Sequence, residues 1–383
     1  MTRFIRRVTW LPLLLVGAAT ARGQSPARLE PGRWAVGFTH VARADTSRPL
    51  PSGRPRPLDI GVWYPARTSG GPRLTYRRYF LLTPAPQDSL PAAESARREL
   101  DGFSDVLVAH GAPRASVSAW LDAAMLATGD APPAGGRFPL VLVAQGNGQT
   151  LHDQAPLAEY LASYGYVVAS VPSPMRIAGP LTGEREMGAR AEEQAADLAF
   201  VLARMAGRPD VADGRLGVVG HSFGARAALL LAMREPRIAA LVSLDGGIGT
   251  ATGRESLASQ PSYAPSAMRG SILHLYERLD PFMAPDFALL RSLSSADRWL
   301  VEVPAMHHHH FASLGAVSVT EPGLRPALGA SDRTASAYCA MAAAVRDFLA
   351  AFLKNDTRAR ARLGSNAAWP PLGAPVHLAR RSH

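Results

Sequence analysis

Short apolar segments rich in β-branched residues alternate with helical segments along most of the chain. Examples of the first kind are FPLVLVA (138–144), YVVASV (166–171), LGVVG (216–220) and IAALVSL (238–244). Between them, stretches such as EEQAADLAFVLARM (192–205) place apolar residues on one face of a helix. Strands that alternate with helices indicate a mostly parallel sheet covered by helices on both faces. The 383 residues leave room for such an α/β fold with an insertion.

Two regions fall outside this alternation. Residues 1–23 combine a basic start, an apolar run and small residues at the end, which is the layout of a secretory signal peptide. We therefore expect an exported protein, periplasmic or extracellular, in which residues 24–383 form a single domain. Residues 70–138 indicate an insertion before the nucleophile half of the sheet, with helical pieces over 92–103 and 118–126. We expect this insertion to cap the site, to form a wall for the substrate or to decorate the sheet edge.

The formal net charge of +10 does not indicate a nucleic-acid partner. It reflects 41 Lys and Arg residues against 31 Asp and Glu residues, and four of the arginines precede residue 24. The other basic residues are scattered, and no basic stripe is interleaved with aromatic residues. The single cysteine, Cys339, allows no intrachain disulfide.

One serine lies in a strand-turn-helix context that favours nucleophilic chemistry. Ser222 stands between Gly220 and Gly224 in LGVVGHSFGARAALLLAM (216–233), where an apolar strand passes into an Ala/Leu helix. A G-x-S-x-G turn of this kind is so tight that side chains at the two glycines would collide. The backbone N–H of Phe223 lies at the start of the helix, where it can face a developing oxyanion. We expect Ser222 to be a nucleophile.

A nucleophilic serine needs a base and an acid that orients the base. Two acids close later strands, Asp245 after AALVSL and Asp280 after ILHLYERL, and either fits. Any of the four histidines from His307 to His310 in MHHHHF could be the base. Four histidines also suggest a metal site, but consecutive residues cannot all face one ion, and no carboxylate or cysteine cluster completes such a site. No cofactor is implied.

These segments resemble the plasma-type platelet-activating-factor acetylhydrolases and their bacterial relatives, a dienelactone-hydrolase-like branch of the α/β-hydrolases. The resemblance rests on GHSFG, on SLDGG after the next strand, and on HHHF, which fits a His-x-x-Phe pattern. VAQGNG and LDIGVWYP are similar to the glycine turn and an early strand of that family. The resemblance runs from about residue 34 to residue 352 and fits poorly over the insertion.

The resemblance implies the α/β-hydrolase fold and assigns the site residues. It makes Ser222 the nucleophile, Asp245 the acid and His308 the base. Backbone N–H groups of Phe223 and Asn147 would form the oxyanion hole.

This sequence departs from the family pattern in two places. Ala225 replaces a second glycine after the serine motif, and Gln145 and Asn147 replace the usual His and Leu of the glycine turn. The second change predicts a more polar pocket beside the scissile carbonyl.

The resemblance implies an exported serine esterase acting on carboxylic esters with short or oxidised acyl chains, phospholipid-like esters included. Its partner would be a small-molecule or lipid ester, without nucleic acid and without a stable membrane anchor once the signal peptide is cleaved. Two alternatives remain at this point: a peptidase or amidase on the same fold, and a catalytically inactive binding protein. The sequence leaves the acyl-chain length and the oligomeric state open.

Overall fold

The computed structural model describes residues 28–68, 71–82, 91–179, 181, 183–365 and 369–381. The expected signal peptide at 1–23 lies outside the described residues. The strands are β1 (Ala35–Asp45), β2 (Arg56–Ala66), β3 (Arg73–Thr75), β4 (Ala124–Gly129), β5 (Leu140–Ala144), β6 (Val167–Val171), β7 (Leu216–His221), β8 (Ile238–Leu244), β9 (Ser271–Tyr276), β10 (Arg298–Glu302) and β11 (Val376–Leu378).

The α-helices are α1 (Tyr76–Phe80), α2 (Ala92–Ala109), α3 (Arg114–Leu121), α4 (Leu151–Ser163), α5 (Met175–Ala178), α6 (Glu184–Met205), α7 (Gly224–Arg234), α8 (Ala251–Leu257), α9 (Ala288–Ser292), α10 (Ser313–Thr320), α11 (Asp332–Leu353) and α12 (Thr357–Leu363). Short 3-10 helices are η1 (Gly247–Gly249), η2 (Pro265–Ala267), η3 (Pro281–Met283), η4 (His308–Phe311) and η5 (Pro322–Leu328).

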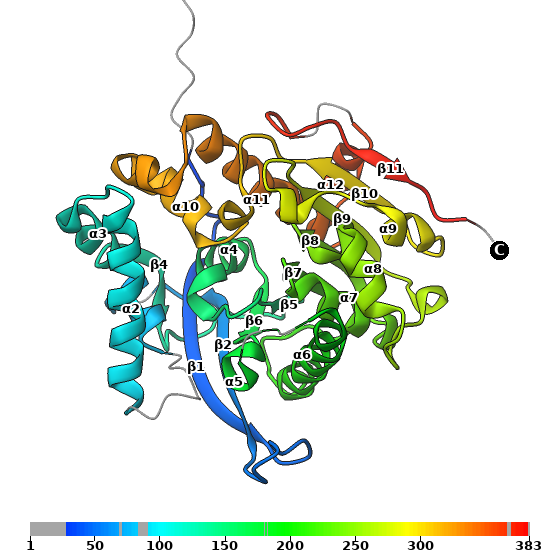
Figure 1. Ribbon diagram of the computed structural model, residues 1–383, viewed down its shortest axis with the longest axis horizontal. Coiled ribbons are helices and arrows are strands. Elements are labelled where there is room, and N and C mark those ends of the chain that lie inside the picture. The colour runs from blue at the N-terminus through cyan, green and yellow to red at the C-terminus, as the bar shows by residue number, and fades with distance from the viewer. Residues whose placement is uncertain are drawn as a thin grey trace, which may run out of the picture.

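All strands belong to one sheet with the order β11-β10-β9-β8-β7-β5-β6-β2-β1-β4-β3 (Figure 1). The central run from β10 to β6 is parallel throughout. Antiparallel pairs lie outside it, where β11 joins β10, β2 joins β6, and β1 joins β2. The prediction of a mostly parallel α/β sheet is therefore confirmed.

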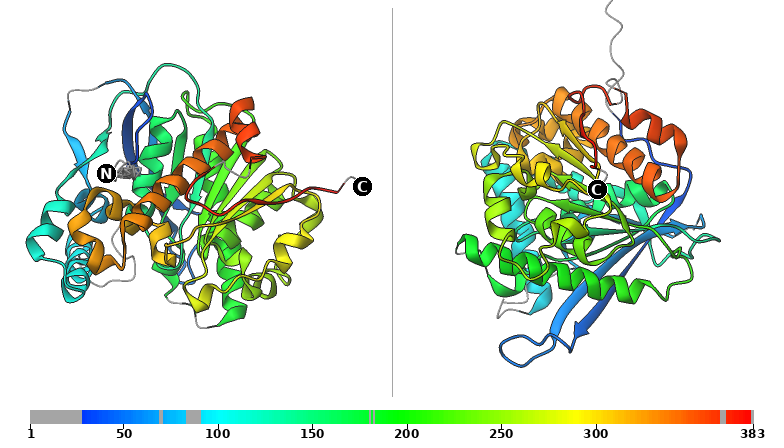
Figure 2. Two further views of the ribbon diagram at one scale, coloured as in Figure 1. Left: turned by 90° about the horizontal axis from the view of Figure 1, so that it is seen from above. Right: turned by 90° about the vertical axis from the view of Figure 1, so that its right-hand side faces the viewer.

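Strand β5 shows why both faces of the sheet are covered. Successive side chains of a strand point to opposite faces, and in LVLVA every side chain is buried. Leu140, Leu142 and Ala144 face a core that also contains residues of α6 and α7. Val141 and Val143 face a second core formed with α4 and α11. The continuous apolar pattern of the strand thus reflects helices on both sides, which Figure 2 shows from two directions.

The insertion contains β3, α1, α2, α3 and β4. The predicted helix over 92–103 lies within α2 and is confirmed. The predicted helix over 118–126 is wrong at its C-terminal end, because α3 stops at Leu121 and β4 begins at Ala124. Strand β4 pairs with β1 and β3. This long-range pairing overrides the local helical preference of an Ala-rich segment.

Helix α11 is long and apolar enough to cross a membrane by length and composition alone. However, 67% of its most apolar window is buried inside the protein, as expected for a core helix. Cys339 is half-buried on this helix, and burial raises the pKa of its thiol to about 11. A thiol that stays protonated at neutral pH is a poor nucleophile.

Candidate active site

Ser222 lies on a sharp turn between β7 and α7. Its φ of 52° is in the left-handed region, which side-chain-bearing residues rarely adopt. A Cβ on Gly220 would lie 2.6 Å from the Ala225 Cα, and a Cβ on Gly224 would lie 2.2 Å from the Ala144 carbonyl oxygen. Both positions therefore require glycine for the backbone to pass. The strand, the tight turn and the helix expected around this serine are all present.

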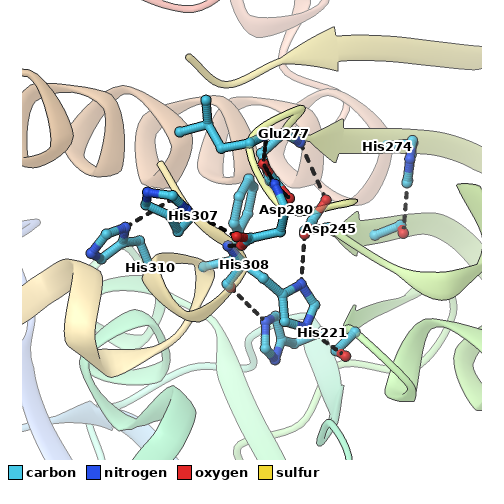
Figure 3. Close-up of polar contacts among 12 residues, drawn as sticks. His221, Asp245, His274, Glu277, Asp280, His307, His308 and His310 are labelled. Carbon is cyan, nitrogen blue, oxygen red and sulfur yellow. Dashed lines mark hydrogen bonds and ion pairs between the residues drawn. The ribbon is translucent and has the colours of Figure 1, made fainter. Parts of the chain in front are cut away.

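The structure brings Ser222, His308 and Asp245 into one hydrogen-bonded chain. Figure 3 labels His308 and Asp245 within it. The Ser222 Oγ is 2.8 Å from His308 Nε2, and His308 Nδ1 is 2.6 Å from Asp245 Oδ2. Asp245 follows β8 directly and is only 1% exposed. In this arrangement Nδ1–H donates to the carboxylate, so the lone pair on Nε2 is free to accept the serine O–H.

Asp280, the other acid considered from the sequence, also binds His308, but it contacts the backbone of His308 and not the ring. Its carboxylate accepts the backbone N–H of His308 at 2.7 Å and contacts His307 Nδ1 at 3.0 Å. Burial alone would raise the pKa of Asp280, but the hydrogen bonds from His308 and His307 outweigh it and hold the pKa below its ordinary value. Asp280 therefore fastens the start of η4, while Asp245 contacts the ring.

The other histidines of the run have structural contacts. His309 and His310 both reach the Leu328 carbonyl through Nε2, at 3.0 and 2.9 Å, and the His307 backbone N–H donates to His310 Nδ1. Burial lowers the pKa of His309 and lowers that of His310 to about 3, so both rings are neutral near pH 7. Among the described residues, no group of three or more His, Cys, Asp or Glu side chains is placed to hold a metal ion.

The two backbone N–H groups predicted for the oxyanion hole belong to Phe223, next to the serine, and to Asn147 in the glycine turn. Within the described chain, neither Phe223 N–H nor Asn147 N–H donates a backbone–backbone hydrogen bond among the turns, loops and caps. The glycine turn that carries Asn147 is tied to the neighbour of the serine, because Gln149 Oε1 accepts both Gly146 N–H, at 2.7 Å, and the His221 ring, at 2.9 Å. Fixed donors of this kind are what an oxyanion hole requires.

The prediction of a more polar pocket is wrong for Gln145. This side chain is fully buried, and its Nε2 donates to Ser170 Oγ at 3.0 Å. Its backbone carbonyl accepts Gln194 Nε2 at 2.9 Å. Gln145 thus belongs to a polar support beneath the glycine turn, and of the two changed residues only Asn147 is exposed.

Sequence reasoning missed two residues that contact the site. The His221 ring stacks on His308 with centroids 5.0 Å apart, and burial, helped by His308, lowers the pKa of His221 to about 3. The backbone N–H of Glu277 donates to Asp245 Oδ1 at 3.2 Å, and its carboxylate accepts the N–H of Asp280 at 3.0 Å. Only their closeness in sequence to Ser222 and to Asp280 could have pointed to them.

The insertion at 70–138 is hydrogen-bonded to two helices outside it, α10 and α5. Tyr76 donates to Ser313 Oγ at 2.5 Å, at the start of α10, which comes directly after η4. Glu99 on α2 forms two hydrogen bonds, at 2.7 and 2.6 Å, with Arg176 of α5. A cavity of about 320 Å³ between the insertion and α10 has no residue of the Ser-His-Asp chain in its lining.

The fold is similar to that of solved structures. One of them is a ferulic acid esterase from Streptomyces cinnamoneus, with a TM-score of 0.61 and 22% sequence identity over 85% of this chain and 92% of that chain. The protein has the α/β-hydrolase fold. In all, 829 chains of solved structures match, and a fold so widely shared does not assign a reaction by itself. No protein-family model matches the sequence, and no curated protein does either.

Proposed function

We propose that the protein is a serine esterase that cleaves carboxylic esters through an acyl-enzyme. The observation that carries this proposal is the hydrogen-bonded chain from Ser222 through His308 to Asp245. Ser222 is the nucleophile, His308 is the general base and acid, and Asp245 orients the ring. Phe223 and Asn147 supply the two N–H groups that bind the oxyanion.

The reaction follows from these positions. His308 Nε2 takes the proton of Ser222 as Oγ attacks the ester carbonyl carbon, and the two N–H groups stabilise the charge that develops on the carbonyl oxygen. The tetrahedral intermediate then breaks its C–O bond, and His308 gives the proton to the departing alcohol. Water attacks the acyl-enzyme with His308 again as base, which releases the acid and restores Ser222.

The substrate class is the finer part of the proposal. We propose short-chain or phospholipid-like acyl esters, supported by the motifs that resemble platelet-activating-factor acetylhydrolases. The ferulic acid esterase of similar fold supports ester hydrolysis in general. We also propose that the enzyme is exported, and this rests on residues 1–23 alone.

The test is hydrolysis of p-nitrophenyl esters from acetate to decanoate by wild type, Ser222→Ala and His308→Ala. We expect both variants to lose at least roughly 10³-fold in kcat. Ser52→Ala is the matched control, because Ser52 is an exposed serine in the loop between β1 and β2. Wild-type turnover by Ser222→Ala would overturn the proposal, and equal turnover of p-nitroanilides would replace the esterase with an amidase.

A further inference from the structure

Two large apolar side chains lie exposed in the segment between β9 and the end of η3, and one of them contacts His308. Leu279 is 50% exposed and Phe282 is 70% exposed, whereas most large apolar side chains in the described part of the chain are buried. The Phe282 ring packs against the His308 ring with centroids 5.2 Å apart and an interplanar angle of 80°. We name these two residues the 279/282 patch. Exposed apolar surface next to a reactive group is typical of a ligand contact.

The segment that carries the patch is held in place. The Glu277 carboxylate accepts backbone N–H groups of Leu279 and Asp280. Asp280 in turn binds the backbone of the histidine that the patch contacts. Met283, the last residue of η3, is buried and anchors this short helix. Phe282 therefore lies on a fixed turn. This favours ligand binding, because little conformational entropy is lost when the ligand binds.

The charges around the patch favour an uncharged ligand group. Arg278 lies in the same segment, but its Nε donates to Glu302 at 3.0 Å, and its guanidinium packs over the Tyr276 ring, 5.2 Å from the ring centroid. Asp280 is engaged by His307 and by the backbone of η4. These contacts leave the apolar surfaces of Leu279 and Phe282 as the part of this turn that gains most from being covered.

The contact with His308 indicates which part of an ester the patch meets. In the proposed reaction His308 Nε2 must come within hydrogen-bond distance of the alcohol oxygen in order to protonate it. The alcohol therefore lies on the histidine side of the scissile bond, where Phe282 packs. We propose that the 279/282 patch binds the apolar, alkyl or aryl part of the alcohol, and this inference rests on the proposed serine esterase function.

The first experiment keeps the acyl group constant and varies the alcohol. We measure kcat/KM for methyl, butyl and benzyl acetate with wild type, Phe282→Ala, Phe282→Leu and Leu279→Ala. Burying a large apolar side chain against the ligand contributes free energy of binding, so Phe282→Ala should lower kcat/KM for benzyl acetate about tenfold. The loss should be smaller for butyl acetate and smallest for methyl acetate. Phe282→Leu should recover part of the loss. Val106→Ala is the matched control, because Val106 is an equally apolar side chain, 55% exposed, on α2.

The second experiment keeps butanol as the alcohol and lengthens the acyl group from acetyl to octanoyl. The ratio of the wild-type kcat/KM to that of Phe282→Ala should stay constant across this series. A ratio that grows with the acyl chain would place the patch on the acyl side and overturn the inference. An equal loss on methyl and benzyl acetate would also overturn it, because Phe282 would then act only by supporting His308.

The two proposals fail separately in these experiments. Should Ser222→Ala retain ester hydrolysis, the serine mechanism is wrong whatever Phe282 does. Should Ser222→Ala be inactive while Phe282→Ala shows no dependence on the alcohol, only the role of the patch is wrong. Circular dichroism checks folding, and we expect no change because Phe282 is largely exposed.

Discussion

Asp245 and Asp280 follow neighbouring parallel strands and bind the same histidine in different ways. Asp245 comes directly after β8 and contacts the His308 ring at 2.6 Å. Asp280 comes after the turn that follows β9 and accepts the His308 backbone N–H at 2.7 Å. The Asp245 carboxylate is almost completely buried, whereas 21% of the Asp280 side chain is exposed.

This difference shows that a place at the end of a strand does not define the role of an acid. The turn after β9 places Asp280 next to the backbone of His308, the first residue of η4, and not next to the His308 ring. Glu277 shapes that turn by accepting the N–H of Asp280, and its own N–H donates to Asp245. The Asp245 carboxylate therefore sets the tautomer and orientation of the His308 ring. The Asp280 carboxylate sets the position of the His308 backbone.

The largest effect that separates the two acids is expected for Asp245→Asn. An amide in this position can favour the wrong tautomer of His308, so that Nε2 carries a proton and cannot accept one from Ser222. In Ser-His-Asp enzymes such a change lowers kcat by about 10⁴-fold. Steady-state hydrolysis of p-nitrophenyl acetate measures it.

A matched aspartate provides the control for this prediction. Asp213 is 81% exposed, pairs with Arg137 and lies at the opposite end of β7 from Ser222, so Asp213→Asn should behave as wild type. Near-normal turnover by Asp245→Asn would remove Asp245 from the proposed mechanism.

A smaller loss is expected for Asp280→Asn. This variant keeps the ring contact between His308 and Asp245 but weakens the support of the η4 backbone. We expect a drop in kcat of roughly tenfold, since misplacing a catalytic group slightly is less harmful than removing its orienting charge. If Asp280→Asn were as inactive as Asp245→Asn, the division of roles between the two acids would be wrong.

The smallest effect concerns stability in acid. The pKa of Asp280 lies below its ordinary value of 3.8 in the folded protein, so the unfolded chain binds the proton more readily. The stabilisation is thus complete above about pH 4 and disappears as the pH falls through the folded pKa. Chemical denaturation should therefore find Asp280→Asn less stable than wild type at pH 5, with a difference that shrinks toward pH 2. A difference that grows in acid would contradict this cause.

Local patterns in the sequence predict much of the fold and of the site. The two glycines around Ser222 and the β-branched strand before it are sufficient to predict the turn, because that geometry depends on neighbours in sequence. The parallel strands of the centre are predictable because strands that alternate with helices along the chain favour parallel pairing. The motif resemblance nominated Asp245 and His308, and the structure places both beside Ser222.

Features set by distant contacts could not be predicted. Strand β4 begins inside a segment with a helical pattern, because β1 and β3 offer it partners. The burial of Gln145 depends on Ser170 in the neighbouring strand. The choice between Asp245 and Asp280 depends on the shape of a turn that Glu277 holds, and the sequence alone leaves both acids at strand ends.

Active-site labelling tests the central claim most directly. Wild type, Ser222→Ala, Asp245→Asn and Asp280→Asn are treated with a fluorophosphonate, and the rate and position of labelling are measured by mass spectrometry of the intact protein and its peptides. We expect a single label on Ser222, no label on Ser222→Ala, much slower labelling of Asp245→Asn and only modestly slower labelling of Asp280→Asn. A label on another residue, or equal rates for wild type and Asp245→Asn, would contradict a serine activated by His308 and Asp245.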